Sequence, residues 1–367
     1  MILRNLFIIT SLICLVSCTS WITRDLSIPR INSAVAQVAN KLYIAGGEIA
    51  EGIETTSIEV LNLDTFDFEP SDLHLPSPRQ LLSAVPVGSK IYFSGGVHHE
   101  SNIVLFNEST AHFSLLPNAP TVRNILHVRL VGNTLLCVFG DISLDIYDMV
   151  SGTWTTVEEY RSVVKQLVKF GFDVVDNIAY IVGGVYKQNG TLCSNVWTFN
   201  LLSHSLTCYY NSILPQYFPQ GLKVSISATG LVTNGGCNGA PYNQIINVLN
   251  FQTNLWLSTV LDALDPALGA ISLGTITDAY AYIVVDAKVK SLASKIMVVA
   301  LANLKVNTVT LPLMTGTYSA LVAVGGKVLV CGQASLLNFY YTIDGLSVSL
   351  GASLGGTLPS LSVELNG

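Results

Sequence analysis

Six side chains of types that can bind metal lie in two segments that each follow a short apolar run: Glu48, Glu51, Glu54, His98, His99 and Glu100. Carboxylates and imidazoles are competent metal ligands. Neighbouring residues of an extended chain point in opposite directions, so few of these side chains could reach one ion. We therefore expect solvated polar loops that could contact a ligand, and no metal site.

Both segments belong to a pattern that recurs along the chain: a small polar turn, a short alternating apolar run, and then Gly-Gly or a degenerate form of it. The copies close at Gly47, Gly96, Gly140, Gly184, Gly236, Asp286 and Gly332. Successive copies lie 44 to 52 residues apart, which is a period typical of repeat architectures. We expect the loops after these copies to lie on one face, where Tyr186 and Tyr242 join the candidate binding residues.

A second apolar run follows each copy and closes on Asp or Asn, which favours a hairpin turn. The closing residues are Asp64, Asn107, Asp148, Asn200, Asn250, Asn303 and Asp344. After several of these turns an aromatic residue opens a third run: Phe68, Phe113, Trp154 and Trp256. Together with the run that precedes each copy, this gives four short antiparallel strands per repeat, as in the blade of a β-propeller.

The pattern resembles the Kelch repeat over residues 21–351, with the Gly-Gly pair intact in four copies. The resemblance implies an all-β propeller of four-stranded blades, with seven blades expected and six as the alternative. A strand that ends against the crowded propeller axis needs a residue without Cβ. We expect Trp21 to Leu26 to pair with strands near Leu337 to Leu350 and close the ring. Residues 352–367 form a further strand or a tail.

Residues 1–18 have the features of a signal peptide: one early positive charge and the apolar run Leu6 to Val16. That run is too short for a transmembrane helix. Two interpretations of Leu15-Val16-Ser17-Cys18 stay open: a bacterial lipobox with lipidation of Cys18, or a plain secretory signal. The protein is expected to be secreted or lipid-anchored at the cell envelope. In a eukaryotic cell, the sequons at Asn107 and Asn189 would be N-glycosylation sites.

Seven cysteines occur, and Cys193, Cys208 and Cys237 are the best disulfide candidates. Cys193 and Cys208 flank one hairpin, whereas Cys193 and Cys237 fall in loops of neighbouring repeats. Either pair is compatible with the sequence. No C-x-x-C spacing occurs, which argues against a zinc site.

Arg30, Arg79 and Arg123 each precede the first strand of a repeat. They could form a basic rim for acidic ligands. The favoured interpretation is structural: each guanidinium connects neighbouring blades through backbone carbonyls.

The chain has 367 residues, half of them hydrophobic and 11% charged, with a net charge of −6 and no basic run. This composition disfavours nucleic-acid binding. Kelch-fold copper radical oxidases and sialic-acid mutarotases share only the scaffold, and no catalytic residue or cofactor site can be matched here. We expect an exported, non-catalytic module that binds a protein or glycan. The alternative is a sugar-active enzyme of mutarotase type, and the oligomeric state stays open.

Overall fold

The computed structural model describes most of the chain from Ile22 onward. The described residues are 22–50, 52–80, 82–96, 102–120, 127–132, 135–139, 144–158, 160, 167–168, 170–186, 188–191, 193, 195–208, 223–234, 245–260, 268–287, 295–311, 318–324, 327–332, 335–340, 347–350 and 361–364. No described helix is long and apolar enough to cross a membrane.

Five four-stranded antiparallel sheets have an uninterrupted register from the inner to the outer strand. The first contains β2 (Ala34–Val38), β3 (Lys41–Ala45), β6 (Ile58–Asn62) and β7 (Phe68–Glu69). The second contains β8 (Leu82–Val87), β9 (Lys90–Gly95), β10 (Ile103–Asn107) and β11 (His112–Leu115). The third contains β12 (His127–Val131), β13 (Leu135–Phe139), β14 (Leu144–Asp148) and β15 (Thr153–Val157). The fourth contains β17 (Gly171–Val175), β18 (Ile178–Val182), β20 (Val196–Asn200) and β21 (Leu206–Cys208). The fifth contains β22 (Lys223–Ile226), β23 (Gly230–Asn234), β24 (Ile245–Asn250) and β25 (Leu255–Val260).

Two further four-stranded sheets complete the ring, and both have register shifts in the innermost strand pair. The sixth contains β26 (Leu268–Ile276), β27 (Tyr280–Ala287), β28 (Lys295–Ala300) and β29 (Val306–Thr310). The seventh contains β30 (Tyr318–Val324), β31 (Lys327–Gly332), β32 (Ser335–Tyr340) and β1 (Ile22–Asp25).

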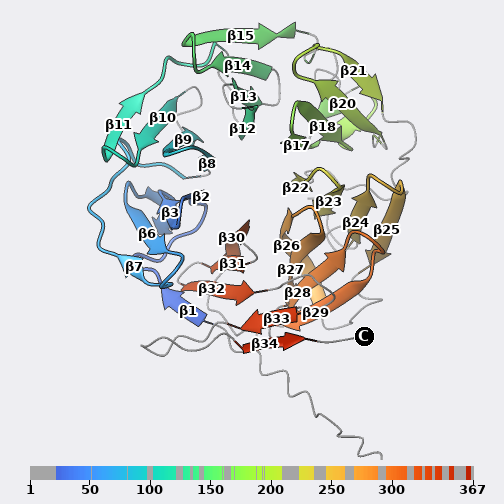
Figure 1. Ribbon diagram of the computed structural model, residues 1–367. Coiled ribbons are helices and arrows are strands. Elements are labelled where there is room, and N and C mark those ends of the chain that lie inside the picture. The colour runs from blue at the N-terminus through green and yellow to red at the C-terminus, as the bar shows by residue number, and fades with distance from the viewer. Residues whose placement is uncertain are drawn as a thin grey trace, which may run out of the picture.

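The sheets stand around a central axis as an all-β propeller (Figure 1), with the inner strands of successive sheets in contact from β2 to β30. The expectation of seven blades, with six as the alternative, is wrong: among the described residues five sheets form regular blades, and the sixth and seventh sheets are irregular in their innermost strand pair. The repeat copies that end at Asp286 and Gly332 fall in the two irregular sheets, and both lack the Gly-Gly pair. A strand with register shifts or bulges bends and leaves the regular ladder.

The two ends of the chain meet in the seventh sheet. β1 pairs antiparallel with β32 from Ile22 opposite Asn338 to Asp25 opposite Ser335. The predicted pairing of the N-terminal segment with the last repeat is therefore confirmed. This pairing covers the edge of β32 that would otherwise be open.

Three two-stranded sheets lie outside this four-strand plan. They are β4 (Glu48–Ala50) with β5 (Ile53–Glu54), β16 (Leu167–Val168) with β19 (Val185–Tyr186), and β33 (Ser347–Leu350) with β34 (Leu361–Glu364). The first two involve the segments that directly follow Gly47 and Gly184. The loops after Gly47 and Gly184 thus contain short strands of their own.

The third and fourth strands of several blades are joined by one recurring turn. A side-chain oxygen at the end of the third strand accepts hydrogen bonds from backbone N–H groups two or three residues later, at Asn62, Asn107, Asp148, Asn200 and Asn250. The residue four positions later has positive φ at Phe66, Ala111, Gly152, His204, Asn254 and also Leu304. Asx turns are therefore confirmed at Asn107, Asp148, Asn200 and Asn250, and Asn303 also accepts from Lys305 N; Asp344 lies outside the described residues. In the first sheet, however, Asn62 makes this contact rather than Asp64.

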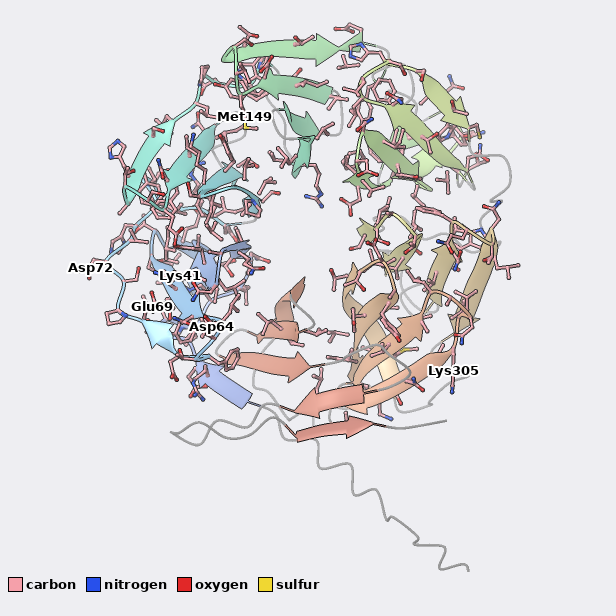
Figure 2. The ribbon with its side chains drawn as sticks, in the orientation of Figure 1. Lys41, Asp64, Glu69, Asp72, Met149 and Lys305 are labelled. Atoms are coloured by element: carbon pink, nitrogen blue, oxygen red, sulfur yellow. The ribbon has the colours of Figure 1, made fainter. Side chains whose placement is uncertain are left out.

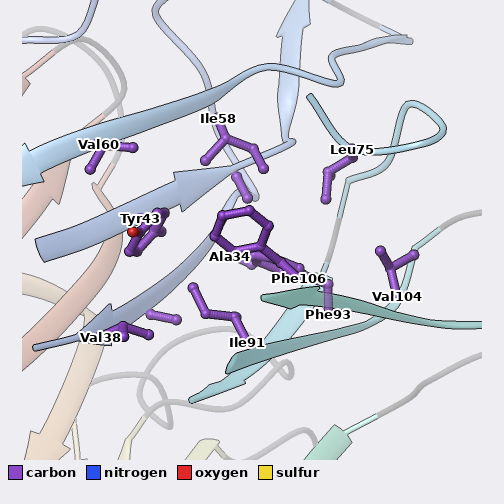
Figure 3. Packing of buried hydrophobic residues seen from close by; sticks show 12 residues of the cluster. Ala34, Val38, Tyr43, Ile58, Val60, Leu75, Ile91, Phe93, Val104 and Phe106 are labelled. Carbon is purple, nitrogen blue, oxygen red and sulfur yellow. The ribbon is translucent and has the colours of Figure 1, made fainter. Parts of the chain in front are cut away.

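The hydrophobic core lies between neighbouring sheets. Tyr43 of the first sheet and Phe106 of the second have ring centroids 5.6 Å apart, and Ile91 and Phe93 pack in the same cluster (Figure 3). Charged side chains such as Asp72 and Lys305 lie on the outside of the ring (Figure 2). Apolar contact between sheets, rather than within one sheet, therefore holds the blades side by side.

Gly47 and Gly52 provide a matched test of the crowding at the Gly-Gly pair. Both have positive φ, but an added Cβ would lie 2.6 Å from the Ile31 carbonyl oxygen at Gly47 and would meet nothing within 4 Å at Gly52. Gly52→Ala should lower the free energy of unfolding by about 1–2 kcal/mol, the cost of the left-handed conformation. Gly47→Ala should lower the free energy of unfolding by about 1–3 kcal/mol more than Gly52→Ala does, because the added Cβ overpacks the site. Thermal unfolding of both variants measures the difference, and equal losses would contradict this packing.

Candidate functional site

After Gly47 the strands β4 and β5 pair antiparallel, and these two strands are called here the β4–β5 hairpin. Its base is fixed to the lead-in segment of the first sheet, because Ile31 N donates to Glu48 O at 3.0 Å and Glu48 N donates to Ile31 O at 2.8 Å. Thr55 N also donates to the Gly47 carbonyl at 2.9 Å. The hairpin is therefore hydrogen-bonded at both ends to the body of the propeller.

A buried ion pair lies beneath the hairpin. Arg30 is fully buried, and its Nη2 donates to Glu59 Oε1 at 2.6 Å. Its Nη1 donates to the carbonyls of Gly46 at 3.2 Å and Ser57 at 2.9 Å. Burial lowers the pKa of the Arg30 guanidinium, and the Glu59 carboxylate opposes that shift. Arginine remains charged under these conditions, so the pair is ionic.

The Glu59 carboxylate also holds the chain that leads from β1 to β2. It accepts hydrogen bonds from Ser27 N at 2.8 Å and Ile28 N at 3.3 Å. Sequence reasoning missed this residue. In the sequence, Glu59 stands out as a single carboxylate within the apolar run of β6. A charged side chain that is buried in such a strand needs a partner of opposite charge.

Arg79 occupies the corresponding place in the second sheet. It is almost fully buried, and its Nη1 donates to the Gly95 carbonyl at 3.4 Å. The carbonyl of Arg79 in turn accepts from Gly47 N at 2.7 Å, which joins the first two sheets. Both guanidinium groups are buried and donate to carbonyls of their own sheet, so the expected connection of neighbouring blades by the guanidinium is wrong; at Arg79 the backbone carbonyl makes that connection. Arg123 lies outside the described residues.

The β4–β5 hairpin presents two isoleucines to solvent. Ile49 is 40% exposed and Ile53 is 55% exposed. Glu48 and Glu54 lie opposite each other at the base of the hairpin, and Glu48 Oε1 accepts from Gly52 N at 2.7 Å. The hairpin therefore exposes two isoleucines and carries two paired carboxylates at its base. Sequence reasoning selected the carboxylates and missed the isoleucines.

Tyr186 lies in a second loop, in strand β19 of the small sheet with β16. Its interaction with the Cys193 side chain, followed by burial, raises the pKa of Tyr186 to about 12. Cys193 is buried and Cys208 is half-buried, and both are free thiols. Burial is the main cause that raises the pKa of the Cys208 thiol, and the nearby Cys193 raises it further. The raised pKa disfavours the reactive thiolate at neutral pH.

One ion pair lies among the inner strands. Arg129 of β12 donates through Nε to Asp173 Oδ1 of β17 at 2.5 Å, and Asp173 Oδ2 accepts from Ile226 N of β22 at 3.0 Å. Asp173 Oδ1 also accepts from Val174 N at 2.9 Å. The carboxylate is thus engaged by donors from three consecutive sheets, and its role is to connect them.

Of the predicted binding residues, the structure brings Glu48 and Glu54 together and places Tyr186 in a different loop. Several predicted residues lie outside the described part of the chain: Cys18, Glu51, His98, His99, Glu100, Cys237 and Tyr242. Within the described ranges, no three His, Cys, Asp or Glu side chains form a group that could hold a metal ion.

No protein-family model matches the chain. No curated protein matches its sequence either. The propeller architecture therefore comes from the strand order and register, and the Kelch resemblance rests on the repeats alone.

The buried pair can be tested by removing one partner and then both. Arg30→Met leaves the Glu59 carboxylate buried without its cation and should cost about 3–5 kcal/mol of stability. The double variant Arg30→Met/Glu59→Leu removes both charges and should regain part of that loss. Thermal unfolding and near-UV circular dichroism compare the two variants. A single variant as stable as the parent protein would contradict the role of this pair.

Proposed function

We propose that this chain is an exported, non-catalytic propeller of the Kelch type that binds a protein partner through the loops after its Gly-Gly pairs. The observation that carries the proposal is the β4–β5 hairpin. Ile49 and Ile53 are exposed there, while the base of the hairpin is held by hydrogen bonds to Ile31 and Gly47. Loops positioned by a rigid scaffold are common binding sites.

The chemistry of the hairpin favours a protein surface as the partner. Interfaces combine an apolar centre with a polar rim, and the isoleucines beside Glu48 and Glu54 have this arrangement on a small scale. A hairpin that is already ordered loses little conformational entropy on binding. The fixed base therefore supports affinity as well as position.

Export is proposed from the sequence of residues 1–18. The early positive charge, the apolar run and the small residues that follow are typical of a cleaved signal. The lipobox interpretation of Leu15 to Cys18 would hold the propeller at a membrane surface. Fractionation of the native cells, with intact mass of the mature chain, distinguishes an acyl group on Cys18 from a soluble secreted product.

The binding proposal is tested with two matched double variants. Ile49→Ser/Ile53→Ser changes the hairpin, and Val150→Ser/Leu202→Ser changes two other exposed aliphatic residues, 79% and 63% exposed, in turns between third and fourth strands. Neither variant should alter the unfolding temperature, because surface substitutions of this kind have small effects. The hairpin variant should bind the native partner at least about tenfold more weakly, as expected for loss of central interface contacts.

The measurement is quantitative affinity capture on the native cell envelope or medium, with the captured protein then titrated against each purified variant. Equal affinity of the two double variants would contradict a binding role for the hairpin. Loss of affinity only in the Val150→Ser/Leu202→Ser variant would place the binding surface in the turns between the third and fourth strands.

A further inference from the structure

The tip of the loop after β19 has the sequence Asn189-Gly190-Thr191, and these residues are not buried in the core of the propeller. Asn189 and Thr191 are both exposed. The loop is closed by Tyr186 N donating to Thr191 O and by Gly190 N donating to Tyr186 O, each at 2.9 Å. It is therefore a short, ordered projection.

The side chains of this tip are arranged around one amide. Asn189 Oδ1 accepts from Thr191 N at 3.1 Å and from the Thr191 hydroxyl at 2.8 Å. Both contacts engage the oxygen of the carboxamide, and its Nδ2 has no hydrogen bond to any described residue. The nitrogen is thus the part of the side chain left for solvent.

There is also room for a large substituent. An added Cβ at Gly190 would meet nothing within 4 Å. Gly190 has φ +69°, which turns the chain sharply at this point. Asn189 itself and both described neighbours in the tip are exposed, so a bulky group on the Asn189 amide would meet solvent.

The second sequon, Asn107-Glu108-Ser109, has a different setting. Asn107 is the last residue of β10 and pairs with Lys90 on one side and His112 on the other. Glu108 N donates to Ser89 O at 2.9 Å, and Asn107 Oδ1 accepts from Ser109 N at 3.1 Å. This sequon is fixed inside the turn of a blade, and Asn107 is half-buried.

We propose that Asn189 is an acceptor for an N-linked glycan and that Asn107 is not. The donor is a lipid-linked oligosaccharyl diphosphate, used by a membrane-bound oligosaccharyltransferase. The Asn189 Nδ2 nitrogen forms a bond to the anomeric carbon of the first sugar, and the bond from that carbon to the phosphate oxygen breaks. The lipid diphosphate leaves with the bonding electron pair, and the amide nitrogen gives up one proton.

The fourth sheet, which carries this loop, lies across the ring from the first sheet (Figure 1). A glycan on Asn189 would therefore stand apart from the β4–β5 hairpin and leave it accessible. The inference rests on the export part of the proposed function and does not depend on binding through the hairpin.

The test is translation of the full chain with endoplasmic-reticulum microsomes, with protease protection to report translocation. The translocated chain should carry one glycan that peptide-N-glycosidase removes, converting the Asn189 side chain to a carboxylate that peptide mass spectrometry locates. Asn189→Gln and Thr191→Val should each abolish the glycan, Thr191→Ser should retain it at lower occupancy, and Asn107→Gln should leave it unchanged.

Three results would overturn the proposal: a translocated chain without a glycan, a glycan that persists in Asn189→Gln, or a chain that is not translocated and so never meets the donor. Only the last of these also counts against export. Equal partner affinity of the Ile49→Ser/Ile53→Ser and Val150→Ser/Leu202→Ser variants, with an intact glycan, would overturn the proposed binding function alone.

Discussion

The buried ion pair of Arg30 and Glu59 fixes the point where the closing strand β1 meets the first blade. Its cation reaches the carbonyls at the end of β3 and before β6, and its carboxylate holds the backbone between β1 and β2. One ion pair therefore connects the strand that closes the ring, the first regular blade and the base of the exposed hairpin. A buried charge pair with several further hydrogen bonds favours a single arrangement of these elements, because any slip would leave a charge without a partner.

Other polar contacts also connect neighbouring sheets, and they use different residues. The main chain of Arg79 joins the first two sheets, because Gly47 N donates to its carbonyl, and the Asp173 carboxylate joins the third, fourth and fifth through their inner strands. Apolar clusters fill the space between sheets, so the polar contacts define register while burial of apolar surface supplies most of the stability. A ring of this kind is a rigid support for loops, which accounts for an ordered hairpin whose aliphatic tip faces solvent.

Much of the architecture could be predicted from the sequence because the repeat carries local signals. Gly47 is needed because the backbone there has positive φ and leaves no room for a Cβ. Asn62 is needed because its side-chain oxygen accepts a hydrogen bond from the backbone of the turn. Both signals can be read from the local sequence. The irregular inner pairs of the sixth and seventh sheets have no such signal, since register shifts depend on how neighbouring sheets pack. Glu59 lies 29 residues from Arg30 and is brought to it by the pairing of strands in the first sheet. Arg129 and Ile226 lie 44 and 53 residues from Asp173, and the ring of sheets brings these three residues together. The exposed isoleucines were missed because apolar residues in a sequence are expected to be buried.

The two ends of the chain close the ring in one sheet and so fix the platform for the loops. Hydrogen exchange of the mature protein, followed by peptide mass spectrometry, reports on this closure. The amides that pair β1 with β32 should exchange as slowly as the paired amides of the inner strands β2 and β8, because this pairing opens only when the ring opens. Exchange of the β1 amides at the rate of an unstructured peptide, while the other sheets stay protected, would contradict it.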